Sequence, residues 1–319
     1  NSTSVTFADG LHVGAQVKFT TSVINSASYG NAFQISYTPP FTDSVATSVG
    51  AKLAQYVSVK DFGAVGDGVT DDTAAINRAL YQLYCVQSNS QIRRSLFFPA
   101  GTYLITNTIK VPPYCLLYGE GPDSSIINFA PATWTSTVSY AADILVKSGS
   151  NYYRSLGTVP AGTLLSNTTY WTLSALPDYI VQTANNAQQT GANIPLATPP
   201  QSIEIQNIKF QTTEIMDGFL VEDAANCAFV GVNIQGPLTT ADLDTSVDDV
   251  AAVRWASTAS LICNHITFEN CVLSGFTFGT ATEQQLQSIT FSNCKFDTLY
   301  QGAYLGGASP VLGGATGVR

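Results

Sequence analysis

Four carboxylates in one part of the chain are the residues best suited to chemistry. Glu222 ends an apolar, strand-like segment, and Asp244, Asp248 and Asp249 lie in an acidic stretch, residues 237–249. Glycoside hydrolysis needs two carboxylates that face each other across a groove, one to donate a proton and one to attack or to activate water. We take these four residues as the candidate catalytic set. A solvated loop or a cation site is the alternative interpretation of such an acidic stretch.

Aromatic and cationic residues suited to sugar binding occur on both sides of these carboxylates. Trp134 and Trp171 belong to a long segment, residues 130–200, that has little periodicity, while Arg254 and Trp255 directly follow the acidic stretch. Segments of such length are often functional. We expect all four side chains to contact a substrate. Alternatively, the rings fasten the segment to the rest of the molecule or to a neighbouring subunit. Arg254 could also serve as the base of a Ca²⁺-assisted elimination.

The cysteines and histidines form no metal-binding pattern. His12 and His265 lie far apart, and the chain contains no C-x-x-C motif. Zinc sites need several such ligands at short spacings. We therefore expect no metal and no other cofactor, and we interpret the cysteines as reduced core residues, with disulfides as the alternative. The six are Cys85, Cys115, Cys227, Cys263, Cys271 and Cys294.

A repeat in the second half of the chain indicates how these residues are positioned. Residues 266–273 and 289–296 share the pattern of an apolar strand, then Asn and Cys, and residues 205–210 and 226–234 are looser copies. A period in the low twenties, built from short strands, is typical of a stacked β-solenoid. The repeated Asn fits the left-handed backbone of a turn between two sheets.

The segment before the repeat supplies a start for the solenoid. Residues 57–59 predict a strand, and residues 70–86 predict an amphipathic helix with Thr70 as its N-cap and Asp71 and Asp72 in its first turn. An open solenoid end exposes unpaired strand edges. We therefore expect this helix to cover the first coil as a cap.

The N-terminal part divides into two short regions. Residues 1–43 alternate in short bursts between glycines and predict a small β module. Residues 44–56 predict a helical neck, because Ala46, Val49 and Leu53 have a/d spacing. Such a helix lies either on its own domain or where several chains meet. The solenoid would then occupy residues 57–319, be incomplete at its C-terminus, and carry an excursion at 130–200.

Composition excludes some partners. Hydrophobic residues make up 45% of the 319 residues, charged residues only 11%, and the net charge is -9. Phosphate binding needs clustered Lys and Arg, so we expect no nucleic-acid partner. No apolar run is long enough to cross a bilayer, and we expect no membrane insertion.

Three ordered motifs resemble the pectate-lyase-like superfamily. The stretch Val57–Ala79, which includes Lys60-Asp61-Phe62-Gly63 and Thr70-Asp71-Asp72, is similar to its entry signature. Residues 98–103 (FPAGTY) and 117–121 (LYGEG) match its next two elements. The resemblance implies an all-β fold, a right-handed parallel β-helix (a pectate-lyase-like solenoid) with an N-terminal capping helix and a small N-terminal β module.

Residues 37–41 (YTPPF) and 52–61 further resemble bacteriophage tailspikes and tail-fibre-like proteins. That resemblance implies a homotrimer in the virion tail, whose module at residues 1–43 attaches to the virion through tail or baseplate proteins. It also implies recognition, and in many members depolymerisation, of host surface polysaccharide, capsule or O-antigen. A tail protein that only docks to other virion parts is one alternative. A secreted pectin-type lyase or hydrolase is another, although residues 1–10 show no signal peptide.

Overall fold

The computed structural model describes residues 32–86, 95–184, 199–239, 249–257, 262–282 and 286–305. The chain divides into two compact units, residues 1–55 and residues 56–319.

Three stacks of parallel strands build the second unit, and each full turn of the chain adds one strand to each stack. The first stack contains β3 (Val57–Ser58), β5 (Leu96–Phe98), β8 (Leu116–Gly119), β15 (Glu204–Gln206), β18 (Ala225–Val230), β21 (Cys263–Glu269) and β23 (Leu286–Ser292). The second contains β4 (Asp67–Asp71), β6 (Gly101–Ile105), β9 (Ser125–Phe129), β16 (Lys209–Thr212), β19 (Asn233–Gln235) and the first parts of β22 (Val272–Thr282) and β24 (Lys295–Leu305). The third contains β7 (Ile109–Val111), β14 (Tyr179–Thr183), β17 (Asp217–Glu222), β20 (Ala251–Ala256) and the later parts of β22 and β24.

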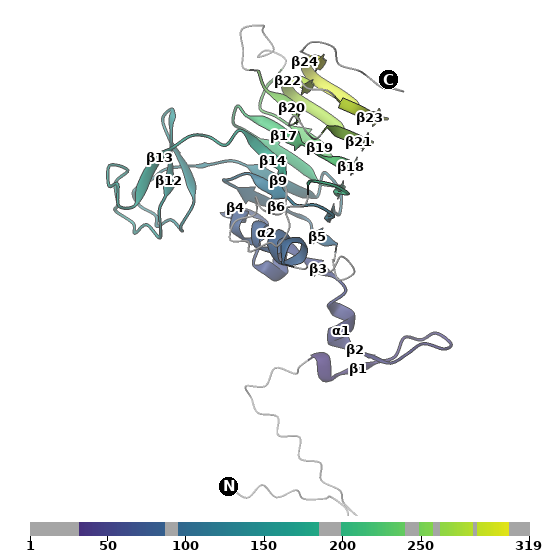
Figure 1. Cartoon of the computed structure of the whole chain (residues 1–319). Helices are drawn as coiled ribbons and strands as arrows, with labels where there is room; N and C mark the ends of the chain where they lie inside the picture. The colour runs from purple at the N-terminus through teal and green to yellow at the C-terminus, as the bar shows by residue number, and fades with distance from the viewer. Residues whose placement is uncertain are drawn as a thin grey trace, which may run out of the picture. The chain divides into compact units, whose positions relative to one another are not determined.

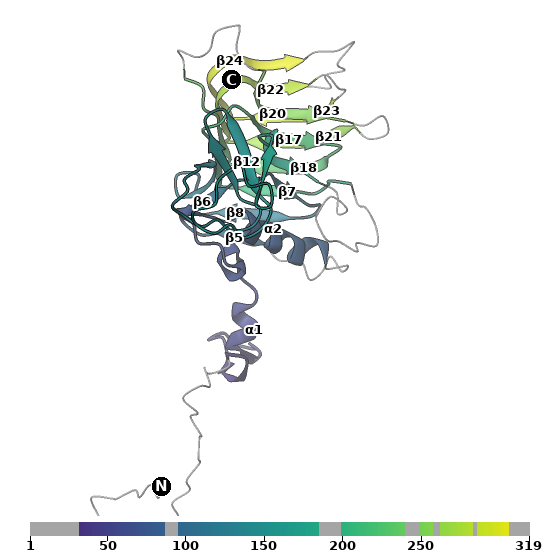
Figure 2. The ribbon, with the colours of Figure 1, turned by 90° about the vertical axis from the view of Figure 1, so that its left-hand side faces the viewer.

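The strands succeed one another as rungs along the axis of the stack (Figure 1), and Figure 2 shows β17, β20, β22 and β24 as consecutive rungs. Strands β22 and β24 pass through a corner, so that the second and third stacks join into one 11-stranded sheet. This arrangement confirms the predicted parallel β-helix.

Residues with a left-handed backbone conformation turn the chain at the corner between the first and second stacks. Asn207, Asn270 and Asn293 have φ angles of 54°, 55° and 52°, and Gly231 occupies the equivalent position of the intervening coil with φ 62°. The Asn293 side-chain amide donates a hydrogen bond of 2.6 Å to Asn270 Oδ1 on the preceding coil. The predicted turn role of the repeated Asn is therefore confirmed, because Asn tolerates this backbone better than other side chains.

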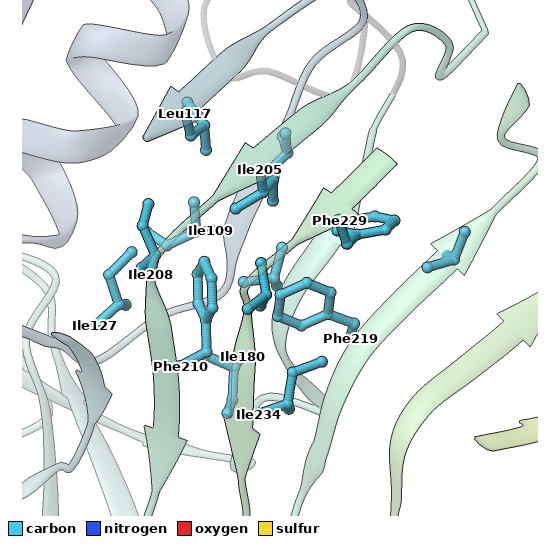
Figure 3. Packing of buried hydrophobic residues seen from close by; sticks show 14 of the residues in the cluster. Ile109, Leu117, Ile127, Ile180, Ile205, Ile208, Phe210, Phe219, Phe229 and Ile234 are labelled. Atoms are coloured by element: carbon cyan, nitrogen blue, oxygen red, sulfur yellow. The ribbon is translucent and has the colours of Figure 1, made fainter. Parts of the chain in front are cut away.

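The interior of the coil is apolar because alternate residues of each strand point inward. Phe229, Phe268 and Phe291 stack on successive coils with ring centroids 4.5 and 4.9 Å apart. Figure 3 shows labelled Ile and Phe side chains from neighbouring strands pointing toward one another in this core. All six cysteines are buried and free, as predicted, and burial raises the pKa of Cys227 to about 11.

The predicted cap is confirmed with a shifted start. Helix α2 (Thr73–Leu80) follows a 3₁₀ turn, η2 (Val59–Phe62), and continues as a π-helical turn, η3 (Tyr81–Cys85). Its buried face packs on the apolar core. Thr70 belongs to β4, and Asp72 occupies the N-cap position. The Asp72 carboxylate instead accepts hydrogen bonds from the backbone N–H groups of Val65 and Gly66, at 2.7 and 3.0 Å. Of the described helices, none is long and apolar enough to span a membrane.

The excursion leaves the coil after β9 and forms its own sheet. Strands β10 (Ala132–Thr133), β11 (Leu145–Ser148), β12 (Asn151–Ser155) and β13 (Trp171–Ser174) pair in that order. They form a lobe beside the stack (Figure 1). The chain returns earlier than the sequence suggests, because β14 lies within residues 130–200 and pairs with β7 and β17.

The first unit is small. Its described part contains a short 3₁₀ turn, η1 (Ala32–Gln34), an antiparallel pair, β1 (Ser36–Tyr37) and β2 (Thr47–Ser48), and helix α1 (Val49–Leu53). Ser48 caps α1 by accepting a 3.0 Å hydrogen bond from the Ala51 N–H. The helical part of the predicted neck is therefore limited to five residues.

Candidate functional site

The structure separates two of the predicted catalytic residues, Glu222 and Asp249. Glu222 is the last residue of β17 and pairs with Ala256, while Asp249 precedes the first residue of β20, Ala251. The five residue steps along β20 alone correspond to about 17 Å, which is too far for two carboxylates that share one glycosidic bond. Glu222 instead accepts a 3.2 Å hydrogen bond from Gln182.

The other two predicted catalytic residues, Asp244 and Asp248, lie outside the described residues. Their roles stay predictions.

A carboxylate–arginine site, formed by Asp217, Asp249 and Arg254, lies where β17 and β20 begin. The Asp217 carboxylate accepts a 2.6 Å hydrogen bond from the Ala251 N–H and two from Arg254, whose Nη2 lies 3.1 Å from Asp217 Oδ1. The same Nη2 donates to the Asp249 carbonyl at 2.6 Å and to Asp249 Oδ1 at 3.3 Å. Arg254 therefore holds the start of β20 against the start of β17.

The two carboxylates of this site differ in their surroundings. The Asp217 side chain is 9% exposed and that of Asp249 is 73% exposed. Burial raises the pKa of Asp217, and its contacts with Arg254 and with the Ala251 N–H oppose that shift. Asp249 is therefore the carboxylate that a ligand can reach, and Asp217 is the residue that positions Arg254.

An open pocket of about 300 Å³ lies beside this site, lined by Asp178, Tyr179, Met216, Asp217 and Asp249 among others. Tyr179 is the first residue of β14 and pairs with Asp217, so three consecutive coils meet at the pocket. Burial, together with the negative charges of Asp217 and Asp178, raises the pKa of Tyr179. Its phenol is therefore neutral at ordinary pH and can donate a hydrogen bond.

Two of the three predicted sugar-binding tryptophans are buried. Trp255 is 3% exposed, packs edge-on to Phe268 in the core of the coil, and donates to Thr280 Oγ1. Trp171 is 2% exposed and packs with Val146 and Val159 in the separate core of the excursion. A buried indole cannot stack on a glycan, so the structure corrects both expectations and leaves these rings as packing residues.

Trp134, the third, is half-buried on the surface of the same small core. Its indole Nε1 is buried and has no hydrogen-bond partner within the described part of the chain. Trp134 and Trp171 therefore pack within the excursion itself, rather than fastening it to the coil as the alternative interpretation of the sequence proposed.

Glu214 connects the excursion to the coil, a role that the sequence did not reveal. It lies in the crossover from β16 to β17, is 8% exposed, and accepts hydrogen bonds from Lys147 Nζ at 2.7 Å and from Tyr152 Oη at 2.5 Å. Lys147 and Tyr152 stand on β11 and β12. Because Asp217 follows three residues later, the anchor of the excursion and the carboxylate–arginine site share one loop.

The described residues contain no group of three or more His, Cys, Asp and Glu side chains arranged to hold a metal ion. The accessible groups of the site are a carboxylate, a guanidinium and a phenol. This set can bind hydroxyl groups of a sugar through charge-assisted hydrogen bonds, and it can move a proton.

The parallel coil defines a class, the pectate-lyase-like parallel β-helix proteins. A family model described as "Rhamnogalacturonase A/epimerase, pectate lyase-like" matches residues 56–306. The chain belongs to that family.

Individual relatives match shorter parts. A glucan 1,3-beta-glucosidase of Cochliobolus carbonum is 45% identical over 67 residues, 21% of this chain and 8% of that protein. The pre-neck appendage protein of Bacillus phage B103 is 36% identical over 79 residues, 24% of this chain and 8% of that protein. The crystal structure of tailspike protein 3 of bacteriophage CBA120 aligns with 86% of this chain and 38% of its own at a TM-score of 0.45 and 12% identity.

Proposed function

We propose that this chain belongs to a phage tail spike that binds polysaccharide on the host surface. The family supports a polysaccharide-directed role, and a phage appendage protein among the relatives supports a place in the virion tail. The observation that carries the proposal is the open pocket beside the carboxylate–arginine site. The pocket is lined by carboxylates and the Tyr179 phenol, and the Arg254 guanidinium is bonded to two of those carboxylates, Asp217 and Asp249.

The residues of the site have distinct roles in this proposal. Arg254 and Asp249 contact hydroxyl groups of the glycan, and the neutral Tyr179 phenol donates a further hydrogen bond. Asp217 holds the guanidinium in place, and Glu214 fixes the loop and the excursion above it. Rigid strands that carry such groups lower the entropic cost of binding a flexible polymer.

Cleavage of the bound polysaccharide is a second candidate function, favoured by one distance. Because Arg254 Nη2 contacts one oxygen of Asp217 at 3.1 Å and one of Asp249 at 3.3 Å, the two oxygens lie at most about 6.4 Å apart, a limit that admits the separation of about 5–5.5 Å in retaining glycosidases. Asp217, whose pKa burial raises, would donate the proton, and Asp249 would attack or activate water. Arg254 must move away from Asp217 for this step.

A homotrimer is part of the proposal, and the exposed hydrophobic side chains of the first unit support it. Among its described residues, 32–55, no large hydrophobic side chain is buried, and Phe41, Val45 and Leu53 are 75%, 82% and 61% exposed. A segment that buries so little apolar surface gains little stability alone. Self-association through the a/d face of α1, or attachment to a virion protein, would cover these side chains.

The binding proposal is tested with capsule and O-antigen preparations from a panel of bacterial strains. We expect the full chain to bind at least one preparation, and Arg254→Met and Asp249→Asn to weaken that binding at least tenfold. Lys60→Met is the matched control, because Lys60 is exposed on η2, next to the cap and away from the pocket. Equal binding by all variants would remove the carboxylate–arginine site from the proposal, and no binding to any preparation would remove the proposal itself.

Cleavage and assembly need separate measurements. A fall in the viscosity of the polysaccharide with release of short oligosaccharides, lost in Asp249→Asn, would support cleavage as the second candidate function.

For assembly, light scattering should give the mass of three chains, and Leu53→Glu should reduce that mass. A monomer at every concentration would contradict the trimer.

A further inference from the structure

A column of amide side chains runs across three coils of the second stack. Asn128 on β9, Gln211 on β16 and Gln235 on β19 occupy paired positions, so each lies directly above the next. Gln211 Nε2 donates a 3.2 Å hydrogen bond to Asn128 Oδ1, and Gln235 is exposed. All three lie on the outer face, because the residues before them, such as Phe210 and Ile234, point into the core.

A pocket of about 320 Å³ opens beside this amide column. Besides the three amides it is lined by Thr212, Thr213, Gly236 and Pro237. The lining thus offers amide and hydroxyl groups and no charged side chain among the described residues. Gly236 and Pro237 leave their part of the pocket wall free of long side chains.

Two acidic groups near the pocket are paired with lysines. Glu214 follows Thr213 in the chain, but its carboxylate is paired with Lys147 at 2.7 Å. Asp297, at the far end of the same column beyond Ser274, is paired with Lys295 at 2.7 Å. With a net charge of -9, the whole chain also repels polyanions.

The same two crossovers line this pocket and the one beside the carboxylate–arginine site. Thr213 faces the amide column, and Met216 and Asp217 face the other pocket. Likewise Pro237 begins and Asp249 ends the crossover from β19 to β20. Thr213 and Met216 lie at opposite ends of the short crossover from β16 to β17, so both pockets adjoin that crossover.

We infer that the amide column is a second glycan subsite, and that it selects an uncharged part of the polysaccharide, recognised through hydroxyl or N-acetyl groups. Amides suit such groups because each offers donors and an acceptor. The coils repeat at about 4.8 Å, close to the length of one sugar ring, so successive amides can contact successive sugar units along the axis. The inference rests on the proposed polysaccharide binding.

The test is equilibrium binding of the full chain to the preparation that it binds best in the panel. Each of Gln211→Ala and Gln235→Ala should weaken binding about 3- to 10-fold, the effect of one or two lost hydrogen bonds. The matched control is Gln206→Ala, an amide on the same coil as Gln211 but on the first stack. It should change binding less than twofold, and thermal unfolding should show that all three variants are folded.

The chemical class is tested with the same polysaccharide after its carboxyl groups have been reduced to alcohols. The weakening caused by Gln211→Ala should persist unchanged with the reduced polymer, because the column recognises uncharged groups. The inference is overturned if the wild type binds and the two column variants bind equally well, or if their effect vanishes on carboxyl reduction. A wild type that binds no preparation overturns the proposed function and this inference with it, which is a distinguishable result.

Discussion

Replacing Glu214 with Gln should loosen the excursion from the coil. Glu214 is 8% exposed, and its carboxylate accepts two hydrogen bonds, from Lys147 Nζ at 2.7 Å and from Tyr152 Oη at 2.5 Å. Hydrogen bonds to a charged group contribute about 1.5–3 kcal/mol, against about 1 kcal/mol for neutral pairs. Because the Lys147 side chain is 38% exposed, solvent screens part of this difference, and we expect a loss of about 1–2 kcal/mol.

Urea unfolding followed by two probes separates the excursion from the coil. Two of the three tryptophans, Trp134 and Trp171, lie in the excursion, so fluorescence reports mainly on it, whereas far-UV circular dichroism reports mainly on the parallel strands. At an m-value of about 1–2 kcal/mol per molar urea, Glu214→Gln should lower the fluorescence midpoint by about 1 M. The dichroism midpoint should move less.

A matched control distinguishes a buried ion pair from an exposed one. Asp297→Asn also removes the carboxylate of a lysine pair, but those side chains are 66% and 48% exposed, and such a pair contributes less than about 1 kcal/mol. If Glu214→Gln left both midpoints unchanged, or if Asp297→Asn shifted them as much, then Glu214 would not anchor the excursion.

Three further predictions concern the core and the site. Trp255→Ala should lower the free energy of unfolding by about 3–5 kcal/mol, measured in thermal melts, because the ring is buried in the core. A loss below about 1 kcal/mol would contradict the burial of Trp255. Burial raises the folded-state pKa of Asp217, so its protonation stabilises the fold fully below its unfolded pKa of about 3.9, and this contribution is lost as the pH rises through the folded value. The stability of the wild type relative to Asp217→Asn should therefore fall as the pH rises from 3.5 to 7; a constant difference in melting temperature would refute this. Cys227, with a pKa of about 11, should resist iodoacetamide at pH 8 in the folded protein and react in guanidinium, and rapid labelling of the native protein would show that the thiol is not buried.

The fold was predictable because its signals are local and repeated. The Asn and Cys spacing of 23 residues between Asn270 and Asn293 gives the length of one coil, and the structure places these two residues in contact. The cap was predictable for the same reason, since its apolar face has helical spacing. Its start moved from Thr70 to Asp72 because the Asp72 carboxylate binds a preceding loop, a contact that no helix rule includes.

The site was only partly predictable, because its residues meet across coils. Asp217 and Arg254 are 37 residues apart and become neighbours through pairing of β17 with β20. Because the acidic stretch lies between these two strands, the sequence does not indicate which of their residues pair. The burial of Trp255 did have a sequence signal. In a strand, Arg254 on the outer face requires Trp255 to point inward, and this alternation argues against sugar binding.

Hydrogen exchange in the presence of a bound polysaccharide tests the central claim most directly. If the carboxylate–arginine site holds the glycan on the flank of the coil, then the backbone amides of residues 213–217 and 249–254 should exchange at least tenfold more slowly in the complex. Protection confined to other described segments, such as β18 and β21 on the first stack, would contradict a glycan site at Arg254.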